Sequence, residues 1–340
     1  MYRLFRPYLF HLDPEQAHHL TLRLLRLAGA APLVRPLLRC LFTGPSRPVQ
    51  AFGRIFKNPV GLAAGYDKDG LAWRGLACLG FSHIEIGTVT PHPQDGNPRP
   101  RLFRLVEDRA LINRLGFPGR GADFVARHLD YPRPPDLALG INLGKNKDTP
   151  LEEAARDYLG LVRIFSHLAD YLAINISSPN TVGLRRLQGR QALENLLRVI
   201  SKERESILSN NPEVRRFPIL VKLAPDLTDE ELDDALEVII GSGMDGVIAT
   251  NTTLRREGLF SLRASETGGL SGSPLLPLSL SVVKKIHRFT QGKLPIIGVG
   301  GIFNADGVQA MLDAGAVLVQ IYTGLVFQGP GLVKQILNSL

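Results

Sequence analysis

Two asparagines and two serines follow one apolar run near the middle of the chain. The run at 171–174 is followed at once by Asn175-Ile176-Ser177-Ser178-Pro179-Asn180. Its length and composition are typical of a strand buried on both faces, and Pro179, which has no backbone N–H, predicts that the strand has ended there. Carboxamides can pair with the edge of a flat heterocycle, and a hydroxyl beside them can take part in proton transfer. A Ser/Asn-rich turn that caps the next helix has the same composition, so these six residues alone leave both interpretations open.

The residues around this stretch predict an α/β architecture. Apolar, β-like runs occur at 60–64, 83–88, 137–143, 171–176, 219–223, 246–250, 296–299 and 318–322. Helical stretches between them lie at 69–79, 150–168, 189–208, 228–241, 278–290 and 304–314. Eight alternating units predict a (β/α)8 TIM barrel. The Pro- and Gly-containing segment 89–118 is expected to pass over the barrel mouth as a long excursion.

In such a barrel the functional residues lie at the C-terminal ends of the strands. These ends, with the 89–118 segment, carry lysines, amides and hydroxyls but no histidine and few carboxylates. That composition disfavours a zinc or magnesium hydrolase, and we expect no metal. Glycines at 298, 300, 301 and 324 suit a phosphate cradle of backbone N–H groups. Together with a lysine at mid-barrel, Lys222, this set suits a flavin mononucleotide (FMN).

Nearly all of the net charge of +8 belongs to the N-terminal segment. Residues 1–58 hold nine Lys/Arg and two acidic residues, whereas the remainder is almost neutral. Asp13-Pro14 predicts the start of a helix, and a second apolar-basic piece occupies 33–42. Neither piece has the roughly 20 apolar residues that span a bilayer. They predict a helical hairpin that either lies on an anionic membrane surface or only caps the barrel.

Ten motifs, in order over nearly the whole chain, resemble those of class 2 dihydroorotate dehydrogenases. They occupy 61–68, 85–91, 100–105, 112–117, 140–147, 175–181, 221–226, 248–253, 268–272 and 297–302. The resemblance implies oxidation of (S)-dihydroorotate to orotate in pyrimidine (UMP) biosynthesis, with FMN as hydride acceptor and a membrane quinone as final electron acceptor.

The resemblance also implies a role for each matching residue. Ser178 would be the base that removes the C5 proton, with Thr181 and Phe117 as its proton relay and gate. The substrate would be bound by Lys68, Asn113, Arg114, Leu115, Gly116, Phe117, Asn175, Asn180, Asn251 and Thr252. FMN would be bound by Ala64, Gly65, Lys68, Thr88, Asn142, Asn175, Lys222, Thr250, Gly272, Gly301, Tyr322 and Thr323. The quinone site would contain His18, Arg104 and Tyr322.

The resemblance divides the chain into residues 1–45, an amphipathic helical segment that forms a quinone tunnel, and residues 46–340, the FMN-binding catalytic barrel. It implies one FMN per chain and the quinone as second substrate. The enzyme would need no partner subunit and no nucleic acid. It would lie on an anionic membrane surface, as a peripheral protein at the cytoplasmic face of the inner membrane.

Three other interpretations remain to be weighed. A class 1 dehydrogenase that uses fumarate or NAD is disfavoured by Ser178, because class 1 has Cys at that place, and by the N-terminal segment. A flavoprotein barrel acting on tRNA is disfavoured by the nearly neutral body, which lacks a broad basic footprint. A scaffold without catalytic activity would be a colourless protein.

Overall fold

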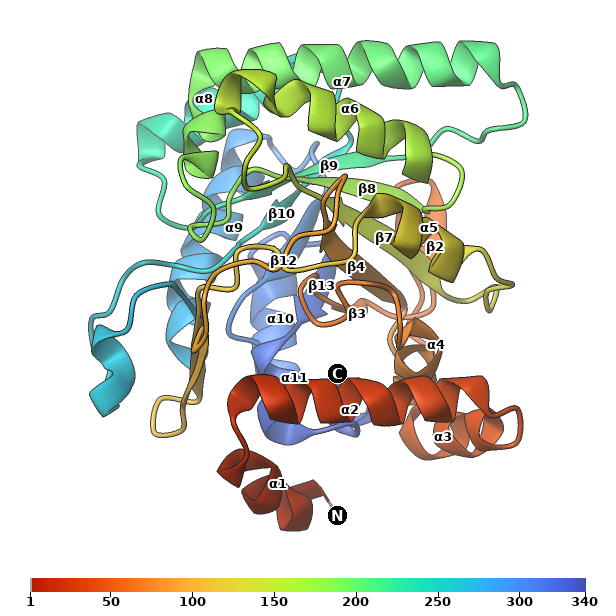
Figure 1. Cartoon of the computed structure of the whole chain (residues 1–340), viewed down its shortest axis with the longest axis vertical. Coiled ribbons are helices and arrows are strands. Elements are labelled where there is room, and N and C mark those ends of the chain that lie inside the picture. The colour runs from red at the N-terminus through yellow and green to blue at the C-terminus, as the bar shows by residue number, and fades with distance from the viewer. Residues whose placement is uncertain (1) are drawn as a thin grey trace.

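Eight parallel strands close into a barrel at the centre of the computed structural model, which describes residues 2–340 (Figure 1). The strands are β3 (Val60–Leu62), β4 (His83–Val89), β7 (Ala138–Leu143), β8 (Tyr171–Asn175), β9 (Ile219–Leu223), β10 (Gly246–Ala249), β12 (Ile296–Val299) and β13 (Leu318–Ile321). Each pairs with the next, and β13 pairs with β3 to close the ring. The (β/α)8 prediction is confirmed, and each predicted strand agrees with the observed one to within two residues at either end.

Helices surround the barrel, and the six predicted helical stretches are confirmed. They correspond to α4 (Trp73–Leu76), α6 (Ala154–Phe165), α7 (Arg190–Asn210), α8 (Asp229–Gly241), α9 (Leu276–Phe289) and α10 (Ala305–Asp313), although α7 runs two residues past its predicted end and α9 begins two residues before its predicted start. Three more were not predicted: α5 (Ala122–Leu129), α11 (Thr323–Gln328) and α12 (Leu332–Ser339). Helix α8 begins with a capping box, in which Thr228 accepts from the Glu231 backbone and Glu231 accepts from the Thr228 backbone.

The strands are apolar on both faces because both faces are buried. Strand residues that point outward pack against the surrounding helices and form the larger of two hydrophobic clusters. Residues that point inward form a smaller cluster, which includes Tyr171, Leu220 and Leu318. A hairpin of β1 (Val49–Ala51) and β2 (Arg54–Phe56) contributes Ala51 and Phe56 to this inner cluster.

The 89–118 excursion is more ordered than a loop. It contains β5 (Leu102–Leu105) and β6 (Ala110–Asn113), which form an antiparallel pair. Strand β11 (Gly269–Gly272), far along the chain, adds to β6 and completes a three-stranded sheet. Burial alternates along β5, because Phe103 and Leu105 pack with Ile112 into a separate apolar cluster while the side chains between them are only partly buried.

The N-terminal segment forms three helices, where the sequence predicted two. They are α1 (Tyr2–His11), α2 (Pro14–Ala30) and α3 (Val34–Phe42). The predicted start of α2 is confirmed, since Asp13 Oδ1 accepts from the backbone N–H groups of Glu15 and Gln16 at 2.9 and 3.1 Å. Helix α2 packs on α4 so closely that a Cβ at Gly75 would lie 2.1 Å from the Leu25 carbonyl oxygen.

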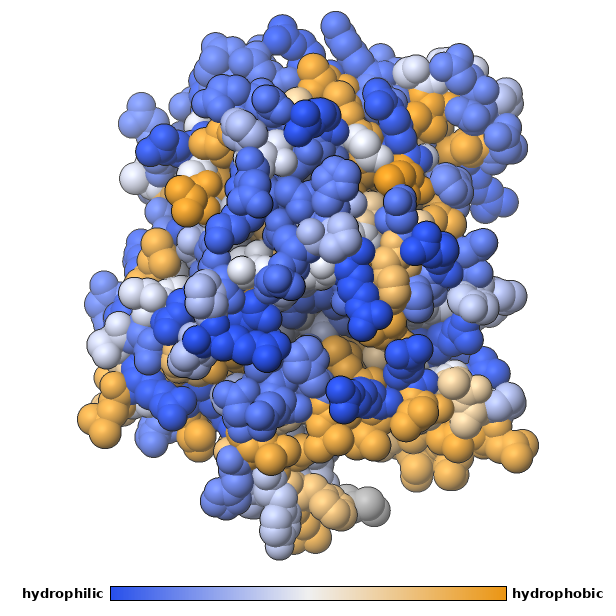
Figure 2. All heavy atoms as spheres, viewed as in Figure 1, coloured by the Kyte–Doolittle hydropathy of each residue, from blue (hydrophilic) through white to orange (hydrophobic). Residues whose placement is uncertain are grey.

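The outer side of these helices is apolar. Their exposed large hydrophobic residues are Leu4, Phe5, Tyr8, Leu20, Leu24, Leu27, Val34, Leu37 and Leu41. Figure 2 shows the resulting patch along the end of the molecule where α2 and α3 lie. Among residues 2–340, no helix is both long and apolar enough to cross a bilayer.

Candidate active site

A cavity opens at the C-terminal ends of the barrel strands, with an empty volume of about 1040 Å³ that includes some open solvent. Most of the site residues expected from the sequence line it: Ala64, Gly65, Lys68, Thr88, Asn113, Leu115, Gly116, Phe117, Asn175, Ser178, Asn180, Lys222, Thr250, Asn251, Thr252, Gly272, Gly301, Tyr322 and Thr323. The structure therefore brings together, at one end of the barrel, residues that are spread over more than two hundred positions of the chain.

Three expected residues do not line this cavity. Arg114 instead donates to Glu266 at 2.7 Å and to Thr267. Asn142 is fully buried, with its amide bonded to Asn175 and Thr88, which do line the cavity. Thr181 is buried just beyond the serine loop. The roles of these three residues, like those of the residues that line the cavity, remain predictions.

The amides at the cavity wall form two hydrogen-bonded groups. Asn180 Nδ2 donates to Asn113 Oδ1 at 3.0 Å, which joins the loop after β8 to the end of β6. Asn251 Nδ2 donates to Ser177 Oγ at 2.9 Å and approaches Asn175 Oδ1 at 3.4 Å. The hydroxyl Oγ1 of Thr252 is buried and has no hydrogen-bond partner. A buried hydroxyl without a partner is costly, so this atom is suited to a polar ligand.

The expected base, Ser178, lies in the same wall. Its side chain is buried and lines the cavity, and its Oγ accepts from the Asn180 backbone at 3.3 Å. Phe117, on the excursion, also lines the cavity. Its φ of +53° lies in a region that residues other than glycine seldom adopt. The ring packs near Gly144, where a Cβ would come within 3.1 Å of it.

Lys68 brings a positive charge to the cavity. Its Nζ donates to the Gly65 carbonyl at 2.8 Å. Burial lowers the pKa of Lys68 to about 8, and the charges of Asp69 and Glu15 oppose that shift. The ammonium is thus charged at neutral pH and sits where it can attract a carboxylate.

The residues of the cavity also fit FMN. Lys222 is almost fully buried yet lines the cavity, so its ammonium can meet a polar ring edge or a negative charge. Gly301 has φ of +76°, and a Cβ there would lie 2.5 Å from the Leu276 backbone nitrogen. Only glycine allows the chain to turn there, beside Thr323, and this leaves backbone rather than side chains facing the place expected for the phosphate.

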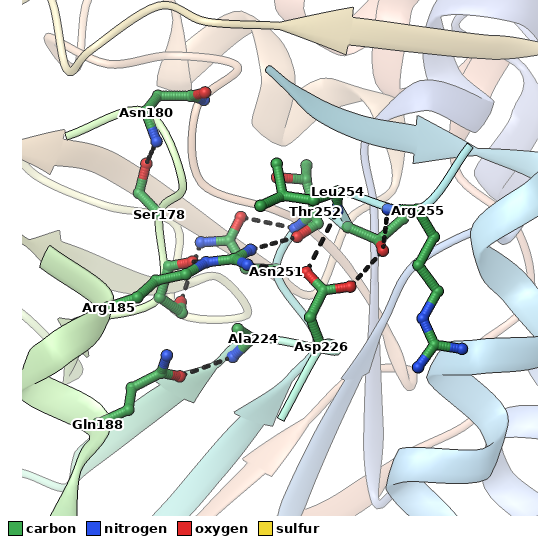
Figure 3. A network of polar contacts seen from close by, with 12 residues as sticks. Ser178, Asn180, Arg185, Gln188, Ala224, Asp226, Asn251, Thr252, Leu254 and Arg255 are labelled. Carbon is green, nitrogen blue, oxygen red and sulfur yellow. Dashed lines mark hydrogen bonds and ion pairs between the residues drawn. The ribbon is translucent and has the colours of Figure 1, made fainter. Parts of the chain in front are cut away.

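One arginine ties together the loops that carry Ser178 and Thr252 (Figure 3). Arg185, in the turn after β8, donates to the Ser177 carbonyl at 3.0 Å, to the Thr252 carbonyl at 2.9 Å and to Asp226 Oδ2 at 2.8 Å. Asp226 also accepts from the Thr253 hydroxyl and, at 3.2 Å, from the Leu254 backbone. We call Arg185 and Asp226 the loop clamp. Sequence reasoning missed Arg185, because nothing local indicates what a turn arginine will contact.

A second cavity lies between the N-terminal helices and the barrel, with an empty volume of about 1050 Å³. Its lining is mostly apolar, and it includes the three residues expected to bind quinone, His18, Arg104 and Tyr322. Burial, with the nearby charge of Lys68, lowers the pKa of His18 to about 3, so its imidazole is neutral. Arg104 donates through Nη1 to the Phe10 carbonyl at 2.9 Å, while its buried Nε has no partner. A neutral imidazole and an unpaired donor in an apolar cavity suit a ligand that carries a carbonyl oxygen.

The two cavities share three lining residues, Leu102, Leu111 and Tyr322. Sequence reasoning identified only the tyrosine. The period of two in a strand is the signal that would have found the leucines. Leu102 lies two residues from Arg104 on β5, and Leu111 lies two residues from Asn113 on β6, so each leucine is on the same strand face as an expected site residue.

Hydrogen bonds and an ion pair link helix α2 to the 89–118 excursion. Glu15 accepts from Arg101 Nη2 at 2.7 Å, and both side chains are nearly buried. Arg101 Nη1 in turn donates to the Asp95 and Asn97 carbonyls at 2.5 and 2.9 Å. Asn97 then donates to the Asn180 carbonyl at 3.1 Å. The N-terminal helices are thus connected by hydrogen bonds to the loop after β8.

Known proteins are similar to this chain in sequence and in fold. The family model described as dihydroorotate dehydrogenase matches residues 48–340. The chain belongs to the dihydroorotate dehydrogenase family. It is 50% identical to the dihydroorotate dehydrogenase (quinone) of Acidithiobacillus ferrooxidans, over 100% of this chain and 94% of that protein. It is 49% identical to the dihydroorotate dehydrogenase (quinone) of a Roseiflexus species, over 100% of this chain and 93% of that protein.

Solved structures of the family have the same fold. The DHODH of Eimeria tenella in complex with ferulenol is 38% identical and superposes with a TM-score of 0.87, covering 96% of this chain and 90% of that one. Its ligand-free form is 40% identical, with a TM-score of 0.86, and covers 93% of that chain. The quinone-dependent relatives align with the whole chain, N-terminal helices included, whereas the dihydroorotate dehydrogenase family model begins only at residue 48.

Proposed function

We propose that this member of the family oxidises (S)-dihydroorotate to orotate in pyrimidine biosynthesis, with FMN as hydride acceptor and a quinone as the final electron acceptor. The observation that carries the proposal is the shared wall of the two cavities. One cavity is rich in amides and hydroxyls, the other is apolar, and both reach Tyr322. Such an arrangement lets electrons leave the first cavity for an acceptor in the second, while the two substrates stay apart.

The amide-rich wall holds the substrate. Dihydroorotate is a planar-edged heterocycle with a carboxylate, and its imide groups match the donors and acceptors of Asn113, Asn180 and Asn251. Lys68 attracts the carboxylate, and the unpartnered Thr252 hydroxyl completes the set. The segment Leu115–Phe117 covers the substrate and excludes water.

Ser178 takes the proton from C5 as the C6–H bond gives up its hydride, so that a C5=C6 double bond forms. A free serine is a weak base, and its proton must pass on. Thr181, with Phe117 as the gate, is the proposed relay. The loop clamp holds this serine loop against the loop of Thr252, which keeps the base and the substrate donors in register.

One FMN per chain would be held by Ala64, Gly65, Lys68, Thr88, Asn142, Asn175, Lys222, Thr250, Gly272, Gly301, Tyr322 and Thr323. When bound, FMN supplies a two-electron acceptor that takes a hydride and passes the electrons on. Lys222 offsets negative charge at the flavin ring, and the glycine at 301 lets the backbone approach the phosphate.

The N-terminal segment, residues 1–45, would give the quinone its entrance. His18, Arg104 and Tyr322 line the cavity beneath α1 and α2, and the exposed apolar side of the helices would enter the surface of a membrane. The excess of Lys/Arg in residues 1–58 favours anionic lipid head groups. The proposal is a peripheral protein at the cytoplasmic face of the inner membrane, with a catalytic barrel at 46–340 and no need for a partner subunit or nucleic acid.

An anaerobic experiment tests the proposal. The flavin absorbance of the purified, flavin-loaded protein is followed as dihydroorotate is added, and then fumarate, NAD or a short-chain quinone. We expect dihydroorotate to bleach the flavin and only the quinone to restore it. In Ser178→Ala the flavin should still bind, with reduction slower by about 10²–10⁴-fold. Recovery with fumarate or NAD would contradict the quinone assignment, and a flavin that dihydroorotate does not bleach would contradict the substrate.

A further inference from the structure

A fully buried carboxylate lies inside the barrel and plays no part in the function proposed above. Glu85, on β4, has no exposed surface and does not line either cavity. Its Oε1 accepts from Asn142 Nδ2 at 2.8 Å and lies 3.6 Å from Lys222 Nζ. Its Oε2 accepts from Gln320 Nε2 at 2.8 Å and from the Tyr171 hydroxyl at 3.1 Å. The carboxylate therefore receives four polar contacts, and all of them are donors.

Lys222 is the only positive group in contact with this carboxylate among the described residues. A charge buried in a barrel interior is very costly unless a counter-ion and hydrogen bonds compensate it. The pair is therefore neutral as a whole. Because Lys222 also lines the cavity where FMN is expected, the charge of Glu85 decides whether the flavin faces a neutral pair or an uncompensated ammonium.

The same carboxylate fixes the direction of the neighbouring amides. A carboxylate can only accept, so Asn142 must turn its NH₂ group toward Glu85. Its Oδ1 then faces Asn175 Nδ2 at 2.9 Å and the Thr88 hydroxyl at 2.5 Å. Asn175 consequently donates inward, and its own Oδ1 accepts from the Ser177 hydroxyl at 3.1 Å. One acceptor-only group thus orients two amides of the proposed site.

We infer that Glu85 is a positioning residue for the flavin: its carboxylate balances the charge of Lys222 and orients the amides of Asn142 and Asn175. This inference rests on the proposed function, since it concerns the flavin that function requires. A residue that only fills space in the barrel would alter folding stability but not the electron affinity of the bound flavin.

The test is the reduction potential of the bound flavin, measured by equilibration with a redox dye of known potential. Glu85→Gln keeps the shape and removes the charge, so the ammonium of Lys222 is uncompensated and favours the reduced, more negative flavin. We expect the oxidised-to-reduced equilibrium to shift at least tenfold toward reduction, which is about 30 mV for a two-electron couple. Lys222→Met should shift it in the opposite direction, and the double variant should lie closer to wild type than either single variant.

Tyr171→Phe is the matched control, because it removes one hydrogen bond from the same carboxylate and leaves every charge in place. Its oxidised-to-reduced equilibrium constant should stay within threefold of the wild-type value. Glu85→Gln should also weaken FMN binding more than Tyr171→Phe does, because glutamine can offer either an oxygen or an NH₂ to Asn142 and no longer fixes its direction. If Glu85→Gln does not fold, the flavin potentials of Lys222→Met and of the double variant Lys222→Met/Glu85→Gln are compared. These two proteins differ only in the carboxylate charge of residue 85.

Equal potentials in wild type and Glu85→Gln, or in the two Lys222→Met proteins, would overturn the inference. The proposed function would survive that result if dihydroorotate still bleached the wild-type flavin. A wild-type protein that cannot be loaded with flavin would overturn the proposed function and the inference together.

Discussion

Replacing Arg185 by lysine should slow flavin reduction, although the guanidinium does not touch the cavity. Lysine keeps the positive charge opposite Asp226 but has a single ammonium in place of the planar fork. The carbonyls of Ser177 and Thr252, now bonded at 3.0 and 2.9 Å, would lose their donor. The perturbation therefore separates the charge of the loop clamp from its geometry.

The expected size follows from those two bonds. A hydrogen bond contributes about 0.5–1.5 kcal/mol net, so the loss of both is about 1–3 kcal/mol. At about 1.4 kcal/mol per factor of ten, a loss of about 2 kcal/mol, the middle of that range, slows a step that needs both loops in register by about thirtyfold. Thermal stability should fall as well, by about 2–4 °C per kcal/mol or somewhat less in a chain of this length.

Stopped-flow reduction by dihydroorotate under anaerobic conditions measures the effect. The limiting rate reports the loop of Ser178, and the apparent substrate affinity reports the loop of Thr252, so both should worsen in Arg185→Lys. Arg163→Lys is the control, because Arg163 makes a comparable two-pronged contact with Glu203 on the exposed surface of the helices. Such exposed pairs contribute about 1 kcal/mol or less. Reduction by Arg185→Lys within twofold of wild type, or an equal defect in Arg163→Lys, would refute the reasoning.

Two further predictions concern charged groups near the substrate. Because burial lowers the pKa of Lys68 to about 8, kcat/KM for dihydroorotate should fall as the pH rises above 8, and Lys68→Met should be slow with no such decline. Burial raises the pKa of Glu15, but the hydrogen bond and charge of Arg101 and the charge of Arg99 outweigh it and hold that pKa below the usual value of a glutamate. The contribution of this pair to stability is thus present above the usual pKa of a glutamate and lost as the pH falls through the lowered one. In thermal melts, Glu15→Gln should therefore lose less stability on acidification than the wild-type protein. Its KM for dihydroorotate should rise a few-fold.

Much of the barrel could be predicted because its strands are locally distinctive. Runs such as 219–223 and 296–299 are short, apolar and bounded by turns, and burial on both faces requires that composition. The strands of the excursion were missed because proline and glycine around them indicate a loop. Their sheet is completed only by β11, more than a hundred residues away, and no local signal reveals such a partner.

The cavity residues were predictable where they follow a barrel strand, because the fold itself brings the strand ends together. Arg185 and Glu15 were not, since each acts through a partner that only the tertiary structure supplies. Glu85 gave a signal that went unused. A carboxylate in the middle of an apolar strand needs a buried partner, and Lys222, on another strand, was the only lysine in such a position.

The two-stranded ribbon of β5 and β6 shows how one alternating pattern serves both cavities. Leu102 and Arg104 point to one side of β5, and their register partners on β6 are Asn113 and Leu111. Asn113 reaches the amide-rich cavity, Arg104 reaches the apolar one, and the two leucines line both. The opposite face of the ribbon, with Phe103 and Ile112, packs into its own apolar cluster. A shift of one residue in this pairing would turn the side chains of the shifted strand to the other face, so that either Arg104 or Asn113 and the leucine of the same strand would leave the cavities. The separation of the two substrates therefore depends on the register of this ribbon as much as on any single side chain.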